Sequence, residues 1–203
     1  MTGEEKRKKK PFLKVLEGGL ISKITWKGIH IVAAPKDAPP FPIEAIALEE
    51  DTFLVMSADP TIRDPKVPLI RIMSNLIETR PQTPGAVLVQ GNAPVRLLAI
   101  IHDFNEDPSW KEEWIEKAFQ GIFEAAEGMR LRSLALPLLG TVHGSLDRCR
   151  SVQFLAESLH HRPLQDLLFL WLVVPGGVCR EVLELLKSQM GTKGRPPFAR
   201  YNP

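Results

Sequence analysis

The residues best suited to chemistry lie in one short loop, Leu139-Gly140-Thr141-Val142-His143-Gly144, which follows an apolar run at 133–138. Glycine lets a main chain approach an anion closely, and the N-terminus of a following helix adds partial positive charge. The pattern therefore predicts a loop that binds a phosphate through backbone amides. An ordinary connection between a strand and a helix has a similar composition, and the loop by itself leaves both interpretations open.

Acidic residues form the second group. Asp37 follows an apolar run at 29–34, and ligands of α/β sheets bind beyond the carboxyl ends of strands. Its other interpretation is a solvated turn residue before prolines. Asp51, Asp59 and Asp64 lie in a stretch that could supply a general base, and Asp51 is the candidate catalytic residue. Ser-His-Asp spacing, a metal-ligand cluster and a Walker loop are missing from the sequence, so neither a metal site nor a cofactor is predicted.

Short apolar runs and helical stripes alternate along the chain and must position these groups. Several runs are apolar at nearly every position, which is typical of strands covered on both faces. The candidate strands are 29–34, 43–48, 86–89, 97–101, 133–138 and 167–174, with a further edge hairpin at 12–26 that turns at Gly18-Gly19. Apolar stripes of helical period cover 114–126, 152–159 and 178–186, and a further helix is expected at 67–79. The order indicates an α/β layered fold.

Composition and charge narrow the class of protein. The chain has 203 residues, 44% hydrophobic and 25% charged, which fits one globular domain. A net charge of +2 is too small to indicate a nucleic-acid binder, so no nucleic-acid partner is predicted. The basic run Lys6–Lys10 is expected to be a solvated tail, with an RNA or membrane-surface contact as the alternative. No apolar run has the length of a membrane span and the N-terminus has no signal-peptide core, so we expect no membrane partner and a cytoplasmic protein. We expect tails at 1–11 and 191–203 around a domain at 12–190.

Several segments in order resemble the macro domain family. The stretch from Asp37 to Asp51 resembles the family's Gly-Asp-Ile-Thr and Val-Asp-Ala-Ile-Val-Asn-Ala-Ala-Asn segments. Residues 132–144 resemble its signature Ser-Ile-Ala-Phe-Pro-Ala-Ile-Ser-Thr-Gly-Val-Tyr-Gly. Pro84–Val87 and Ala99–His102 are similar to two further family strands. The resemblance covers 28–188 and implies a three-layer α/β/α sandwich with a mixed sheet of about six strands.

The resemblance also implies ligand-binding roles. Asp37 stands where the family aspartate accepts a hydrogen bond from the adenine amino group, a task that suits a group with acceptors alone. Leu139, Gly140, Thr141, Val142, His143 and Gly144 stand at the loop that wraps a diphosphate, and His143 replaces an aromatic residue near the distal ribose. For His143 an exposed position is the alternative. His102, at a strand end, is expected to be structural.

The first ligand loop departs from the family pattern. The family's Asn-Ala-Ala-Asn is Leu48-Glu49-Glu50-Asp51 here, and residues 52–64 contain no glycine. Side chains would obstruct a close approach to phosphate, and added carboxylates would repel it. The second loop lacks the family glycine between its threonine and valine. Misplacement by about 1 Å can cost a hundredfold in rate, which counts against efficient hydrolysis.

Three hypotheses follow. The first is a domain that binds ADP-ribose or a related adenine nucleotide without turnover. The second is a macro fold with a degenerate pocket that serves protein-protein contacts. The third is a weak hydrolase of ADP-ribosyl linkages. Asp37 and the loop at 139–144 motivate the first, the glycine-free stretch at 52–64 the second, and the acidic residues at 49–64 the third.

Overall fold

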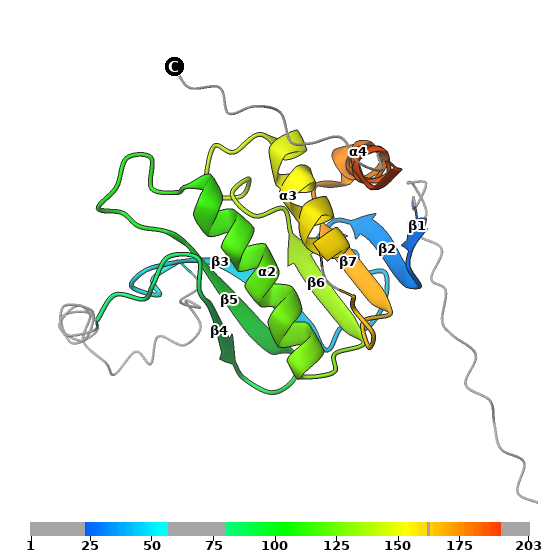
Figure 1. The fold of residues 1–203 in the computed structure, drawn as a ribbon, viewed down its shortest axis with the longest axis horizontal. Coiled ribbons are helices and arrows are strands. Elements are labelled where there is room, and N and C mark those ends of the chain that lie inside the picture. The colour runs from blue at the N-terminus through cyan, green and yellow to red at the C-terminus, as the bar shows by residue number, and fades with distance from the viewer. Residues whose placement is uncertain (1–22, 57–79, 162, 192–203) are drawn as a thin grey trace, which may run out of the picture.

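A seven-stranded mixed sheet forms the centre of the molecule (Figure 1). The computed structural model describes residues 23–56, 80–161 and 163–191. The sheet has the order β1-β2-β7-β6-β3-β5-β4. Its strands are β1 (Lys23–Trp26), β2 (Ile29–Ala34), β3 (Ala45–Asp51), β4 (Val87–Gln90), β5 (Val95–His102), β6 (Ser133–Pro137) and β7 (Phe169–Val173). The five strands from β2 to β5 in this order run parallel, and the outer two are antiparallel to their neighbours. The predicted α/β fold with a mixed sheet is confirmed.

The seventh strand comes from a hairpin at the edge of the sheet. β1 pairs with β2 through a two-residue turn at Lys27 and Gly28, whose φ angles are 45° and 89°. Positive φ at both central residues matches the right-handed twist of a tight hairpin. The sequence predicted an edge hairpin that turns at Gly18-Gly19, and those two glycines lie outside the described residues.

Three helices cover one face of the sheet (Figure 1). They are α2 (Glu112–Gly128), α3 (Arg148–His161) and α4 (Cys179–Gly191), the last preceded by the 3-10 turn η2 (Gly176–Val178). α3 packs between α2 and α4. All three match the predicted stripes, because their apolar positions fall on the face that is buried. The helix predicted at 67–79 and both predicted tails apart from Gly191 lie outside the described residues; Gly191 ends α4.

Alternate residues of the strands contribute to opposite faces. On the helical face the main core includes Ile31, Ala47 and Leu97, together with Phe119 of α2. On the other face Trp171 packs with Ala34 and Ala135. Leu98 and Ile100 of β5 are also buried, at 1% and 0% exposure. Burial on both faces explains why these strands are apolar at almost every position.

β3 extends three residues beyond its predicted end. The sequence predicted a strand at 43–48, whereas the observed strand continues through Glu49, Glu50 and Asp51. These three residues pair with β5, up to the contact of Asp51 with His102. The prediction stopped early because charged residues are rarely buried in a strand. Here they are 6%, 0% and 0% exposed, and their carboxylates have hydrogen-bond partners.

The parallel order brings five loops to one edge of the sheet. The carboxyl ends of β2, β7, β6, β3 and β5 lie side by side there, and we call this the carboxyl edge. The segments that follow these strands are 35–44, 174–178, 138–147, 52–56 and 103–111. Asp37 and the loop at 139–144 are therefore at the same edge, separated by the end of β7.

Candidate functional site

The loop at 139–144 folds tightly at the end of β6. Gly140 has a φ of 82°, and a Cβ atom there would lie 2.5 Å from Cδ1 of Ile115. A Cβ atom on Gly144 would lie 2.5 Å from the carbonyl oxygen of Gly140. Such distances are shorter than any ordinary contact, so both positions require glycine. These glycines allow the loop to approach the core and to fold closely on itself.

Further hydrogen bonds hold this loop in one shape. The amide of Leu146 donates to the carbonyl of Gly140 at 3.1 Å. The hydroxyl of Ser151 donates to the carbonyl of Leu139 at 2.8 Å, and the hydroxyl of Thr141 donates to the carbonyl of Leu138 at 2.7 Å. The loop is thus tied both to α3 and to the end of its own strand.

Glu49 places a carboxylate inside the loop. Its Oε1 atom accepts a hydrogen bond from the Gly140 amide at 2.7 Å, and its Oε2 atom accepts one from the His143 amide at 3.2 Å. The Glu49 side chain is 1% exposed. Two backbone amides that converge on a carboxylate form an anion-binding arrangement, and its occupant in this structure is a side chain of the protein itself. We call the pair of amides from Gly140 and His143 the amide cradle.

The ladder between β3 and β6 explains how Glu49 reaches this position. β3 pairs with β6 at two positions, Ala45 with Leu134 and Ile46 with Ala135. It pairs with β5 along its whole length. Toward the carboxyl edge, β3 therefore follows β5 and no longer bonds to β6. The Glu49 side chain links the two strands again by bonding to the loop that follows β6.

A buried histidine stands behind the Glu49 carboxylate. Nε2 of His102, at the end of β5, lies 3.4 Å from Oε2 of Glu49, and its Nδ1 lies 3.3 Å from the hydroxyl of Ser109. His102 is 1% exposed. Its ring also meets the His143 ring edge-on, with the centroids 6.3 Å apart. The burial and the two partners agree with a structural role for His102.

The other two acids of β3 bind the loop that follows them. Oδ1 of Asp51 accepts the amide of Phe53 at 2.7 Å, and its Oδ2 accepts those of Val55 at 2.8 Å and Met56 at 2.9 Å. Oε1 of Glu50 accepts the amides of Asp51 at 3.0 Å and Met56 at 2.7 Å. In place of a glycine run that binds phosphate, this segment directs the amides of Phe53, Val55 and Met56 at carboxylates of its own chain. Asp51, the candidate base, is fully buried in this arrangement.

The remaining predicted ligand residues differ in exposure. Asp37 is exposed in the turn after β2, where the amide of Ala38 donates to the carbonyl of Pro35. Val142 is 57% exposed and His143 is exposed as well, whereas Leu139 and Gly140 are buried. Asp37 and the two exposed loop residues are thus available to a ligand at the carboxyl edge.

The helix after the loop contributes less than the sequence predicted. α3 begins at Arg148, four positions beyond Gly144. Asp147 caps it, because its Oδ1 atom accepts the amides of Cys149 at 2.8 Å and Arg150 at 3.3 Å. The partial positive charge at this helix end therefore already faces a carboxylate. The amide cradle does not include the first turn of the helix.

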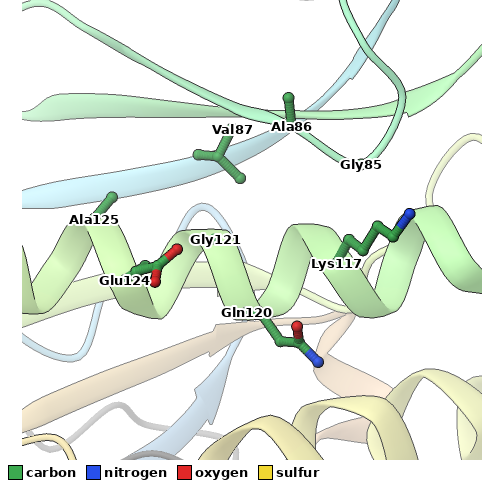
Figure 2. Close-up of a pocket in the computed structure, with 8 residues that line it drawn as sticks. All are labelled: Gly85, Ala86, Val87, Lys117, Gln120, Gly121, Glu124 and Ala125. Atoms are coloured by element: carbon green, nitrogen blue, oxygen red, sulfur yellow. The ribbon is translucent and has the colours of Figure 1, made fainter.

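A hollow lies away from these residues. It has a volume of about 520 Å³ and runs between β4 and α2, where Gly85–Val87 face the helix. Figure 2 shows Lys117, Gln120 and Glu124 along the helix beside it. None of the predicted ligand residues lines it.

Over the described ranges, no set of three or more His, Cys, Asp or Glu side chains is grouped to hold a metal ion. No helix in these ranges is both long and apolar enough to span a membrane.

Comparison with solved structures identifies the fold. No protein-family model matches the chain, and no curated protein matches it. A variant of the macrodomain from Oceanobacillus iheyensis with ADP-ribose is 12% identical, with a TM-score of 0.58, over 84% of this chain and 97% of that one. The same macrodomain with ADP is 11% identical, with a TM-score of 0.59, over 84% and 95%. The macrodomain of Thermus aquaticus DarG is 18% identical, with a TM-score of 0.51, over 71% and 98%. The chain therefore has a macrodomain fold, with a sequence far from those of these solved structures.

Proposed function

We propose that this domain binds ADP-ribose or a related adenine nucleotide at its carboxyl edge and does not turn it over. The observation that carries the proposal is the position of Asp37 and the loop at 139–144 at one edge of the sheet, beyond the carboxyl ends of β2 and β6, where α/β sheets bind ligands. Solved macrodomains of the same fold hold ADP-ribose or ADP. Asp37, exposed two strands away from the loop, supplies acceptors for the adenine amino group.

The acids of β3 support binding without turnover. A general base must reach the water or hydroxyl that it deprotonates. Glu49, Glu50 and Asp51 are buried and each accepts at least two backbone amides. A carboxylate held in this way cannot meet a ligand unless its loop opens. Among the described residues, the acids of β3 are thus fixed as structural groups; Asp59 and Asp64 lie outside the described residues.

Calorimetric titration with ADP-ribose tests binding. Asp37→Ala should weaken binding if the carboxylate accepts a hydrogen bond from the adenine. Asp166→Ala is the matched control, since Asp166 is also exposed but precedes β7 at the opposite edge of the sheet. Equal loss of affinity in both variants would sink the assignment of Asp37. If millimolar ADP-ribose produces no heat of binding and no thermal shift, the proposal of nucleotide binding fails as a whole.

A separate assay tests turnover. Mono-ADP-ribosylated protein is incubated with a large amount of the domain, and free ADP-ribose is measured. We expect the substrate to stay intact. Release of ADP-ribose that depends on Asp51 would replace this proposal with the hydrolase hypothesis.

One observation favours the second hypothesis, a macro fold used for protein contacts. The amide cradle is filled by Glu49, so a phosphate has no vacant donors at Gly140 and His143. If neither the wild type nor a variant without the Glu49 carboxylate binds a nucleotide, the protein-contact hypothesis becomes the better one.

A further inference from the structure

The amide cradle keeps its shape through contacts that do not involve Glu49. The φ angle of Gly140, its packing on Ile115 and the hydrogen bond from the Leu146 amide fix one side of the loop. Hydrogen bonds from Ser151 and Thr141 fix the strand end beside it. Because these contacts hold the Gly140 amide, it would stay aimed at the same point if a different anion replaced the Glu49 carboxylate.

Glu49 is well placed to compete with such an anion. Its two oxygens each accept one amide of the cradle, at 2.7 and 3.2 Å, and its side chain is 1% exposed. Hydrogen bonds from backbone amides to a charged acceptor are among the stronger ones in proteins. A phosphate that approached while Glu49 remained would find these donors in use and a negative charge a few ångströms away, which repels it.

We propose that Glu49 is the residue that determines which ligands the carboxyl edge accepts. Its carboxylate occupies the anion position between the Gly140 and His143 amides, so a phosphate group binds there when Glu49 moves out or is removed. Nucleotides that place a phosphate at this loop are disfavoured, and ligands with a neutral group there are not. The inference rests on the proposed nucleotide function for the identity of the natural ligand, whereas the anion position follows from the loop itself.

Three variants test the inference. Glu49→Ala removes the carboxylate and leaves the cradle donors without their partner. Glu49→Gln keeps the shape of the side chain and removes its charge, and it serves if the alanine variant does not fold. Glu44→Ala is the control, because Glu44 lies just before the first residue of β3, away from the carboxyl edge. Its Oε2 atom also accepts a backbone amide, that of Arg132, at 2.6 Å.

The first measurement is the melting temperature with and without inorganic pyrophosphate, at constant ionic strength. Without it, Glu49→Ala should melt about 5–10 °C below the wild type, because two buried donors lose their acceptor. Millimolar pyrophosphate should raise the melting temperature of Glu49→Ala by about 5 °C more than that of the wild type or of Glu44→Ala. An equal response of all three proteins would overturn the inference.

The second measurement is the affinity for ADP-ribose and for adenosine. Glu49→Ala should bind ADP-ribose at least about tenfold more tightly than the wild type, with adenosine binding unchanged, since it frees the two donors and removes the charge that repels the phosphate. Glu49→Gln, which carries no charge but still fills the position, should show a smaller gain. If pyrophosphate stabilises Glu49→Ala but no variant binds ADP-ribose, the anion position stands and the proposed function fails. If the wild type binds ADP-ribose and Glu49→Ala binds it equally well, the function stands and this inference fails.

Discussion

The shape of the loop at 139–144 leads to a quantitative prediction for Gly140→Ala. Gly140 has a φ of 82°, where an L-residue is strained by about 1–2 kcal/mol. Its Cβ atom would also lie 2.5 Å from Cδ1 of Ile115 and 3.1 Å from Cβ of Leu146. Ile115 is fully buried and cannot turn away freely, so the overpacking adds about 1–3 kcal/mol. We expect Gly140→Ala to lower the free energy of unfolding by about 2–5 kcal/mol.

Gly28→Ala isolates the packing contribution. Gly28 has a φ of 89°, and a Cβ atom there would meet nothing within 4 Å. The alanine at either position has the same effect on the entropy of the unfolded chain. The difference between the two variants therefore measures the contact of Gly140 with the core. It should be about 1–3 kcal/mol in urea unfolding monitored by circular dichroism.

Ile115→Val completes the test, because it removes the Cδ1 atom that the new methyl group would strike. Alone, it should cost about 0.5–1.5 kcal/mol. The double variant should lose less free energy of unfolding than the sum of the two single variants. The coupling energy in the double-mutant cycle should be about 1 kcal/mol or more. Additive effects, or a Gly140→Ala variant no less stable than Gly28→Ala, would refute the reasoning that the core fixes this loop.

Three further predictions concern polar groups around the site. Asp51→Ala should lower the free energy of unfolding by at least about 3 kcal/mol in urea, because three backbone amides lose a charged acceptor; a loss below about 1 kcal/mol would contradict this. Thr52→Val should be neutral or stabilising in the same assay, since the buried Thr52 hydroxyl finds no hydrogen-bond partner in the described residues. Arg150→Ala should cost less than about 1 kcal/mol and less still in high salt, because its ion pair with Glu112 is partly exposed, with side-chain exposures of 38% and 48%. The hydrogen bond from Arg150 lowers the pKa of Glu112. The stabilisation by the ion pair is therefore present above the pKa of Glu112 in the unfolded chain and is lost as the pH falls through its pKa in the folded protein. An Arg150→Ala effect that is undiminished at acid pH would argue against the pairing.

Much of the fold follows from local sequence patterns. Continuous apolar runs located six strands to within a few residues, and stripes of helical period located α2, α3 and α4. The glycines of the loop at 139–144 predict a main chain that can approach an anion closely. These features depend on neighbouring residues, and the period of a strand or helix can be read along the chain.

The extension of β3 could not be predicted in the same way. Its last three residues are acidic, and acids are buried only when they have partners. The partners of Glu50 and Asp51 are amides of the next few residues, a local arrangement that acids before a turn can adopt. Glu49 stands where the family pattern has an alanine, and the sequence predicts from it a carboxylate that repels phosphate. The sequence does not show that this carboxylate itself binds the amides of the loop at 139–144.

The sequence by itself determined the elements, their order and the loop that carries the backbone donors. The tertiary structure decided what those donors bind. Glu49 and Gly140 are 91 positions apart in the chain, and they meet because β3 leaves β6 after two pairs and follows β5. A hydrogen bond between such distant residues depends on how the strands lie in space, which no local pattern encodes. Because of the contact between Glu49 and the Gly140 amide, a side chain of the protein occupies the anion position.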